Sequence, residues 1–304
     1  MSKDNEQAHK KADAVKKHRL GRNAIIAGIV TVAFAAILAL GTLAYNNISL
    51  AGDETFAKRI DAAIEKGLAW TESNKQTILK RRNVGLIKML NEIENLRATP
   101  VFSDIITSFM ATPVRPKCWK RLVDPNWPVD KIELNIAIKK EYLDNKWVLY
   151  AMAPDKAQIR PEEVHLFDPQ RWRGRKLTHQ LDALITLRKA KGANEELDKL
   201  IENLSNRITS ELIFDVAVVD LYIQKVTFLL RAGFPHKIRR RWIERIIENQ
   251  SPDGGWNDRW FCLTSKRRPV FEFGSPPSNQ HATIQALTAL YLARYRYPEH
   301  FGLQ

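Results

Sequence analysis

The stretch WIERIIENQSPDGGW, residues 242–256, contains the two signals that decide how the C-terminal part of this chain folds. Its first part belongs to an amphipathic segment at residues 236–249, which predicts a helix with one apolar face. Its second part combines proline, aspartate and two glycines, the residues that favour a tight reversal. The stretch therefore predicts a surface helix that ends in a turn.

Five residues of this turn have a structural interpretation. Gln250 can satisfy carbonyl groups at the helix end, and Asp253 can accept backbone N–H groups. Gly254 and Gly255 permit a positive φ, and Trp256 would cover the turn with a large apolar face. We interpret the turn as structural and not as a catalytic loop.

Helical periodicity dominates the rest of the chain, and strand-like alternation is scarce. Residues 54–75 and 85–96 each carry one apolar stripe, whereas prolines divide residues 99–128 into short pieces. Residues 135–152 fit either a helix or a strand. Residues 153–176 predict an irregular, charged connection.

From residue 177 onward the pattern predicts helical hairpins. The segments that begin near Thr178, Asp215 and His281 are apolar on most faces, while residues 195–208 and 236–249 are amphipathic. This division predicts inner helices surrounded by outer helices.

The stretch at 242–256, followed by HATIQALTALYLA at 281–293, resembles the helical repeat of the α/α-toroid superfamily of terpenoid cyclases and protein prenyltransferases. In that family an outer helix ends in glutamine, an Asp-Gly-Gly turn and an aromatic residue follow, and an inner helix comes next. The resemblance covers about residues 177–296. The cyclase DxDD cluster and the prenyltransferase zinc ligands have no counterpart here, so the resemblance implies architecture and not chemistry. Other α/α barrels, including polysaccharide lyases and several glycosidases, share this arrangement.

An uncharged apolar run of 22 residues occupies positions 24–45. At about 1.5 Å per residue it is long enough to cross a hydrocarbon core of about 30 Å. Basic residues precede it and Asp53 and Glu54 follow, so the positive-inside bias places the N-terminus in the cytoplasm. A cleaved signal peptide is the alternative, although the run exceeds the usual signal core. The expected parts are a basic cytoplasmic tail (1–22), a single transmembrane helix (23–45) and an extracytoplasmic domain (46–304), periplasmic or extracellular. The predicted fold class is all-α, with this transmembrane helix followed by an α/α-toroid-like helical-hairpin domain that is complete or incomplete.

The net charge is +14, from 48 Lys and Arg against 34 Asp and Glu. Such an excess fits nucleic acid, an anionic membrane surface or an acidic polymer. Because an extracytoplasmic location disfavours nucleic acid, the expected partners are the membrane and an anionic glycan or lipid headgroups. The oligomeric state is left open.

Three residues are candidates for acid–base catalysis. His179 and His281 lie at the starts of two expected inner helices, which in a toroid point toward the mouth of the central cavity. Asp220 is a carboxylate within a third, largely apolar helix. A capping or core role is the structural alternative for each histidine, and a buried hydrogen-bond network is the alternative for Asp220.

The candidate binding residues fall into two groups. Tyr222 and Gln224 are polar residues near Asp220 in the same apolar segment. The tail of the turn and the basic loop after it resemble a lid or binding loop. The candidates there are Asp258, Trp260, Arg267, Arg268 and Glu272.

No cofactor is indicated, and no metal site is expected. The chain lacks P-loop, GxGxxG, HExxH, GxSxG and EF-hand patterns, and neither Cys118 nor Cys262 has a metal-ligand spacing. These two cysteines either pair as a disulfide in an oxidising compartment or stay as separate buried thiols.

Two functions compete. The first is a membrane-anchored domain that binds or processes an envelope polymer or another anionic ligand, with acid–base chemistry at the toroid mouth. The second is a non-catalytic envelope scaffold or binding protein, and isoprenoid chemistry is a third idea that depends on fold analogy alone. Catalysis requires a partly buried pocket where a carboxylate and a histidine converge, whereas a scaffold would have a filled centre.

Overall fold

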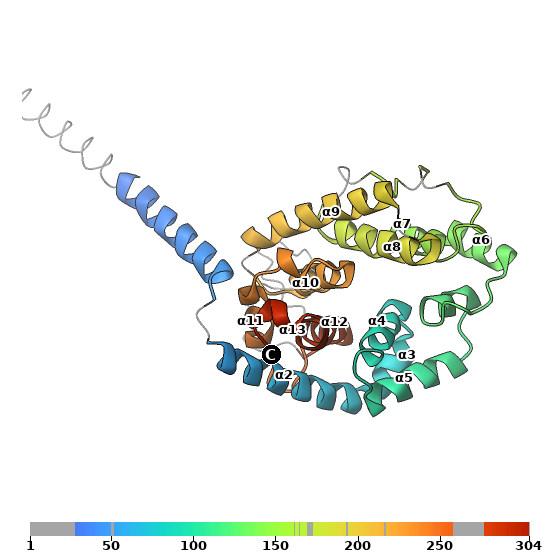
Figure 1. Ribbon diagram of the computed structural model, residues 1–304, viewed down its shortest axis with the longest axis horizontal. Helices are drawn as coiled ribbons and strands as arrows, with labels where there is room; N and C mark the ends of the chain where they lie inside the picture. The colour runs from blue at the N-terminus through green and yellow to red at the C-terminus, as the bar shows by residue number, and fades with distance from the viewer. Residues whose placement is uncertain are drawn as a thin grey trace, which may run out of the picture. The chain divides into compact units, whose positions relative to one another are not determined.

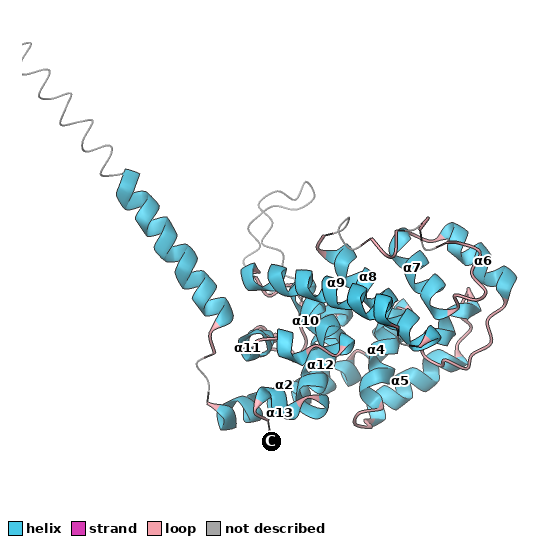
Figure 2. Ribbon diagram, turned by 45° about the horizontal axis from the view of Figure 1, so that its top comes forward, coloured by secondary structure: helices cyan, strands magenta, loops and turns pink. Residues whose placement is uncertain are grey.

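The structure is a computed structural model that describes residues 28–49, 52–160, 162–163, 165–168, 173–192, 194–215, 217–257 and 277–303. Every regular element in these ranges is helical, and none of the described residues forms a strand (Figure 2). The all-α part of the prediction is therefore confirmed. The chain divides into two units, Met1–Tyr45 and Asn46–Gln304.

An apolar helix, Gly28–Asn47, follows the N-terminal tail (Figure 1, blue). The helix has 20 residues, an 18-residue window within it has a mean hydropathy of 2.1, and its large apolar side chains are mostly exposed. By length and composition this helix could cross a membrane. A signal sequence near an N-terminus has the same properties, so both interpretations of the apolar run fit the structure.

The second unit consists of short and medium helices. In chain order they are α2 (Asp53–Ser73), α3 (Lys75–Arg81), α4 (Val84–Glu94), α5 (Pro100–Ala111), η1 (Lys117–Leu122), α6 (Lys131–Lys140), α7 (Leu143–Met152), α8 (Arg175–Lys191), α9 (Glu195–Phe214), α10 (Asp220–Ala232), η2 (Pro235–Lys237), α11 (Arg240–Glu248), α12 (Gln280–Tyr291), η3 (Leu292–Arg296) and α13 (Pro298–Phe301). Residues 135–152, which fitted a helix or a strand, belong to α6 and α7.

Three helices, α8, α10 and α12, are buried along most of their length. Helix α10 packs against both α8 and α12, α12 also packs against α4, and α8 also packs against α7 (Figure 1). The amphipathic helices cover this group, since α2 contacts α12 and α9 contacts α8 and α10. The helices whose sequences are apolar on most faces are thus the buried ones.

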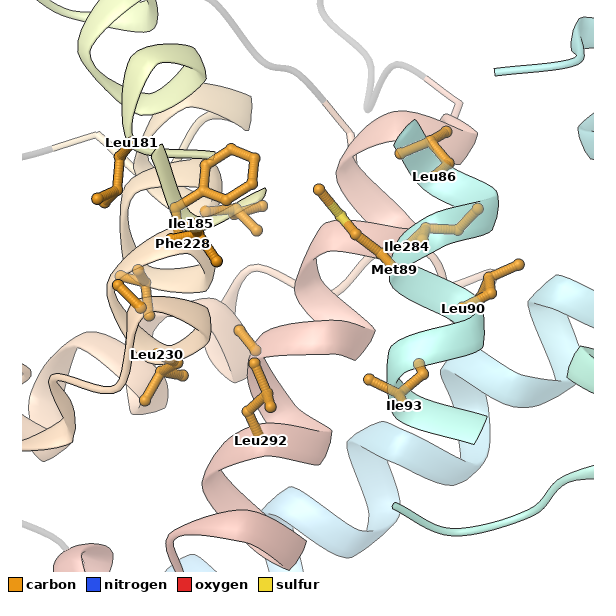
Figure 3. Packing of buried hydrophobic residues seen from close by; sticks show 14 of the residues in the cluster. Leu86, Met89, Leu90, Ile93, Leu181, Ile185, Phe228, Leu230, Ile284 and Leu292 are labelled. Carbon is orange, nitrogen blue, oxygen red and sulfur yellow. The ribbon is translucent and has the colours of Figure 1, made fainter. Parts of the chain in front are cut away.

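The core between these helices is aliphatic and aromatic. Leu86 and Leu90 of α4 lie near Ile284 of α12, and Ile185 of α8 lies near Phe228 of α10 (Figure 3). All five side chains are at most 2% exposed. Each such side chain contributes about 1.5–3 kcal/mol to folding by leaving water, so these contacts hold the buried helices together.

The turn after α11 is fixed against α2. Gly254 has φ +90°, and a Cβ built there would lie 2.5 Å from the carbonyl oxygen of Lys66. Gln250 Nε2 donates to the carbonyl oxygens of Ala63 (2.9 Å) and Gly254 (2.8 Å). The glycine thus permits a close approach to α2 as well as the left-handed conformation.

Asp253 and Trp256 connect the same turn to its other neighbours. Asp253 Oδ1 accepts from Gly255 N (3.1 Å) and from Ser278 Oγ (2.6 Å). Trp256 is buried, and its Nε1 donates to the carbonyl of Ile246 at 2.7 Å. The turn residues are therefore engaged in contacts within the fold.

Candidate functional site

A pocket of about 870 Å³ lies where the N-terminal ends of three buried helices meet. His179 lies near the start of α8, Asp220 is the first residue of α10, and His281 is the second residue of α12. Asn279 caps α12, its Oδ1 accepting from Ala282 N at 2.9 Å. The three candidate acid–base residues thus come from three helices and line one pocket.

His281 and Asp220 are in direct contact. His281 Nδ1 lies 2.6 Å from Asp220 Oδ1, and Gln285 Nε2 lies 3.1 Å from His281 Nε2. If Nδ1 carries the proton, it donates to the carboxylate, and Nε2 accepts from the Gln285 amide or from a bound ligand. The His281 side chain is 38% exposed, so this imidazole is oriented by a carboxylate and remains accessible.

His179 is the second imidazole of the pocket and is half-buried. Burial lowers its pKa below the ordinary histidine value, and the charge of Arg175 acts in the same direction. Asp144 and Asp182 oppose this shift without cancelling it. His179 is therefore a neutral imidazole at neutral pH, able to accept or donate a hydrogen bond.

Cationic groups also line the pocket. Arg81 ends α3 and Arg175 begins α8, where Arg175 Nη2 lies 3.3 Å from Asp144 Oδ2. The Arg175 side chain is 72% exposed, so its ion pair with Asp144 is weak and open to exchange. The N-terminal ends of α8, α10 and α12 add partial positive charge. The pocket thus combines an acid–base pair with groups that suit an anion.

Tyr222 and Gln224 do not line this pocket, although Asp220 does. Gln224 is buried, and its Oε1 accepts from Thr178 Oγ1 of α8 at 2.6 Å. Tyr222 is also buried, with the Arg245 guanidinium 5.3 Å from its ring centroid, and burial raises the pKa of its hydroxyl. Both residues belong to contacts between helices.

The remaining binding candidates, Asp258, Trp260, Arg267, Arg268 and Glu272, lie outside the described residues. So does Cys262, which leaves its pairing with Cys118 a prediction. Cys118 is fully buried, and burial raises the pKa of its thiol to about 12. Among the residues that the structure describes, no group of three or more His, Cys, Asp or Glu side chains could hold a metal ion.

The sequence reasoning did not single out Arg81, Tyr142, Asp144 or Arg175 as site residues. Tyr142 caps α7 and Asp144 lies in its first turn. They were missed because residues 135–152 could not be assigned to a helix, so no helix start was expected there. Arg175 belongs to the basic cluster at residues 171–176, which fits phosphate or uronate binding as a group, but no single residue of it was chosen.

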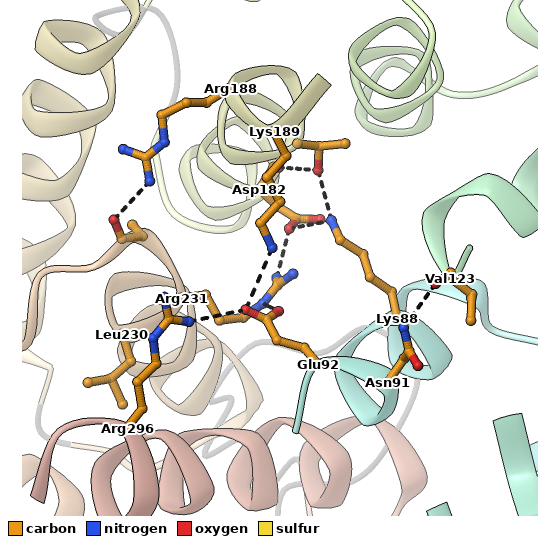
Figure 4. A network of polar contacts seen from close by, with 12 residues as sticks. Lys88, Asn91, Glu92, Val123, Asp182, Arg188, Lys189, Leu230, Arg231 and Arg296 are labelled. Carbon is orange, nitrogen blue, oxygen red and sulfur yellow. Dashed lines mark hydrogen bonds and ion pairs between the residues drawn. The ribbon is translucent and has the colours of Figure 1, made fainter. Parts of the chain in front are cut away.

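A network of buried charges occupies the space between α4, α8 and α10 (Figure 4). Asp182 Oδ1 accepts from Lys88 Nζ at 3.0 Å and from Arg231 Nη1 at 2.7 Å. Arg231 Nε also donates to Glu92 Oε2 at 2.7 Å, and Lys88 Nζ donates to Thr186 Oγ1 at 2.8 Å. We call Lys88, Glu92, Asp182 and Arg231 the buried charge network.

The electrostatics of this network favour full ionisation of its acids. Burial opposes ionisation of Asp182, but the nearby charges of Lys88 and Arg231 hold its pKa well below the usual range. Burial lowers the pKa of Lys88, while Asp182 opposes that change. Because breaking one contact leaves a buried charge without compensation, the network holds the three helices in one arrangement.

Comparisons of this chain with protein-family models, with curated proteins and with solved structures find no match. The interpretation of the pocket therefore depends on its own geometry.

Proposed function

We propose that this protein is a membrane-anchored, α/α-toroid-like domain that binds and processes an anionic polymer of the cell envelope by acid–base catalysis. The observation that carries the proposal is the 2.6 Å contact between His281 Nδ1 and Asp220 Oδ1 in a pocket that also contains His179. A carboxylate that orients an imidazole beside an accessible cavity is a recurring arrangement for proton transfer.

The roles follow from the contacts. Asp220 is a positioning residue, because it fixes the tautomer and orientation of His281. His281 Nε2 is then the general base, and His179, neutral because of its burial, forms a hydrogen bond with the ligand. Arg81 and Arg175 bind carboxylate or phosphate groups of the polymer.

The toroid part of the proposal is supported by the order of helix contacts. Helices α4, α12, α10, α8 and α7 form a continuous series of neighbours, and η1 contacts both α7 and α4. Helices α2, α5, α6 and α9 each contact members of this series. An inner series of helices, three of which (α8, α10 and α12) have their N-terminal ends at one pocket, is the arrangement expected of such a domain.

The anchor part of the proposal is supported by the helix Gly28–Asn47, which is long and apolar enough to cross a membrane. The lysine-rich segment before it favours a cytoplasmic N-terminus and an extracytoplasmic second unit. Topology reporters fused at Asn47 and after Gln304 test this orientation, and a cytoplasmic second unit would remove the envelope polymer as the ligand.

The activity is tested with the full-length protein in detergent, incubated with envelope glycans that contain uronate or phosphate groups. Released products are measured by mass spectrometry. The substitution His281→Gln should lower the rate by about 10²–10⁴-fold, the usual contribution of a general base. The substitution His300→Gln is the matched control, because His300 is an exposed residue outside the pocket. Equal rates for His281→Gln and the wild type would refute the catalytic role.

A non-catalytic scaffold is the second candidate, and the buried charge network favours it. Ion pairs occupy the space between α4, α8 and α10, and a filled centre of this kind is what a scaffold would have. If glycans bind to the wild type and to His281→Gln with equal affinity and neither releases a product, the protein is a binding platform.

A further inference from the structure

The first residues of the second unit form hydrogen bonds with the C-terminal end of α9. Asn46 is fully buried, and its Nδ2 donates to the carbonyl oxygens of Leu212 (2.9 Å) and Ile213 (3.0 Å). Asn47 Nδ2 also donates to Ile213 O at 3.0 Å. These carbonyls belong to the last turn of α9, where the usual i+4 partners are lacking, and Leu212 O also accepts from Asp215 N at 3.2 Å. The two asparagines thus satisfy the C-terminal end of α9.

Helix α11 donates further hydrogen bonds to the same two asparagines. Trp242 Nε1 donates to Asn47 Oδ1 at 3.2 Å, and Arg245 Nη1 donates to Asn46 Oδ1. Arg240 Nη2 donates to the carbonyl of Gly52, just before α2, at 2.8 Å. We call Asn46, Asn47, Trp242 and Arg245 the juxtamembrane clamp.

The clamp follows the apolar helix directly in the chain. The helix ends at Asn47, while Asn46 already belongs to the second unit and is buried there. If this helix spans the membrane, Ile48 is the first residue after its end and therefore meets the lipid headgroup region.

The surface beside the clamp has the composition that such a boundary favours. Phe214, the last residue of α9, is 67% exposed, and Ile48 is 56% exposed. Arg239 is exposed and its guanidinium lies 5.8 Å from the Trp242 ring centroid. Apolar and aromatic side chains enter the interfacial region of a bilayer, and arginine binds anionic headgroups.

We propose that Ile48, Phe214 and Arg239 form a membrane-contact patch that docks on the lipid headgroup surface. The proposal rests on the proposed function in one respect, namely that the apolar helix is retained as an anchor. Ile48 and Phe214 lie among the headgroups, and Arg239 binds lipid phosphate.

The clamp also connects this patch with the candidate site. Arg245 Nη1 donates to the carbonyl of Asp215 at 3.2 Å, and Lys225 Nζ donates to Asp215 Oδ2 at 2.6 Å. Asp215 precedes Asp220, the carboxylate of the pocket, by five positions. One arginine therefore fixes both the start of the second unit and the segment that leads into the pocket.

The patch is tested by depth-dependent quenching in the full-length protein. A Cys262→Ser background receives Phe214→Cys or, as the matched control, Ile132→Cys, which is 73% exposed on α6. Cys118 is fully buried and does not compete for the label. Each cysteine carries an environment-sensitive fluorophore in vesicles of phosphatidylcholine and phosphatidylglycerol that contain a headgroup-nitroxide lipid.

The expected result is quenching of the label at position 214 and none at position 132. Adding Asn46→Ala and Asn47→Ala should abolish this difference, because the unit is then no longer held at the membrane boundary. Equal quenching at both positions, or none at either, would overturn the patch. Intact mass separates the causes: a mature protein that begins at about Tyr45 has lost the apolar run and refutes the anchor and the patch together. An intact chain without quenching at position 214 refutes the patch alone.

Discussion

Asp182 is the residue whose removal should destabilise the domain most. It is buried between α4 and α10, with Lys88 Nζ at 3.0 Å and Arg231 Nη1 at 2.7 Å from the same carboxylate oxygen. The substitution Asp182→Asn preserves shape but removes the negative charge. Lys88 and Arg231, which are at most 8% exposed, then lose the negative charge that offsets the repulsion between their two positive charges.

The magnitude follows from what remains around these cations. Removing one partner of a buried ion pair costs about 3–5 kcal/mol. Arg231 still has Glu92 at 2.7 Å and Lys88 still has Thr186 at 2.8 Å, so we expect the lower end, about 3 kcal/mol of unfolding free energy. For a domain of this size that corresponds to a fall in Tm of roughly 6–12 °C.

The assay is thermal unfolding of the full-length protein, followed by tryptophan fluorescence at a fixed scan rate. Asp198→Asn is the control, because Asp198 pairs with Arg188 at 3.3 Å but is 46% exposed. An exposed pair of this kind contributes at most about 1 kcal/mol. Equal Tm shifts for the two substitutions would refute the reasoning.

The pH dependence of Tm provides a second test of the contribution of the Asp182 charge. The pKa of Asp182 is depressed in the folded protein, so its carboxylate stabilises the fold above the unfolded value of 3.8, and that contribution is lost as pH falls below it. The Tm difference between the wild type and Asp182→Asn should therefore stay constant near neutral pH and shrink only in this acidic range.

Three further outcomes are expected. Gly254→Ala should lower Tm more than Gly233→Ala. Both glycines have φ near +90°, which costs alanine about 1–2 kcal/mol of strain, but only at Gly254 would the added Cβ meet the Lys66 carbonyl. Equal Tm shifts would contradict this contact. The NMR titration of His179 should have its midpoint below pH 6.5. Because the unfolded chain then binds the proton more readily than the folded protein, His179 destabilises the fold as pH falls below 6.5. A midpoint above 6.5 would contradict its burial. Cys118 should resist iodoacetamide until the protein unfolds, because its thiol is buried and its pKa is raised to about 12; rapid labelling of the native protein would contradict both.

The turn at residues 249–256 shows which contacts local chemistry can predict. The positive φ of Gly254 and the bond from Gly255 N to Asp253 follow from neighbouring residues. The bond from Gln250 to Ala63 joins positions 187 residues apart, and nothing near Gln250 indicates it. Sequence reasoning therefore recognised the turn but not its attachment to α2.

The pocket illustrates the same division between local and long-range information. Helix-start patterns placed His179 and His281 at comparable positions, because capping and periodicity are local signals. The contact between His281 and Asp220 joins residues 61 positions apart and depends on how α10 packs against α12. Tyr222 and Gln224, close to Asp220 in sequence, face other helices, and an amphipathic pattern cannot separate these faces when the whole helix is buried.

The buried charge network was not recognised from the sequence, since charged residues in helices usually lie on solvated faces. Its position nevertheless matters for the candidate site. Asp182 and His179 lie three positions apart on α8, about one helical turn, and Asp182 is one of the charges that act on the pKa of His179. The ion pairs that attach α8 to α4 and α10 therefore include a charge that also acts on an imidazole in the pocket. A filled interior and an accessible acid–base pocket are thus compatible in this domain, because the first holds the helix ends from which the second is built.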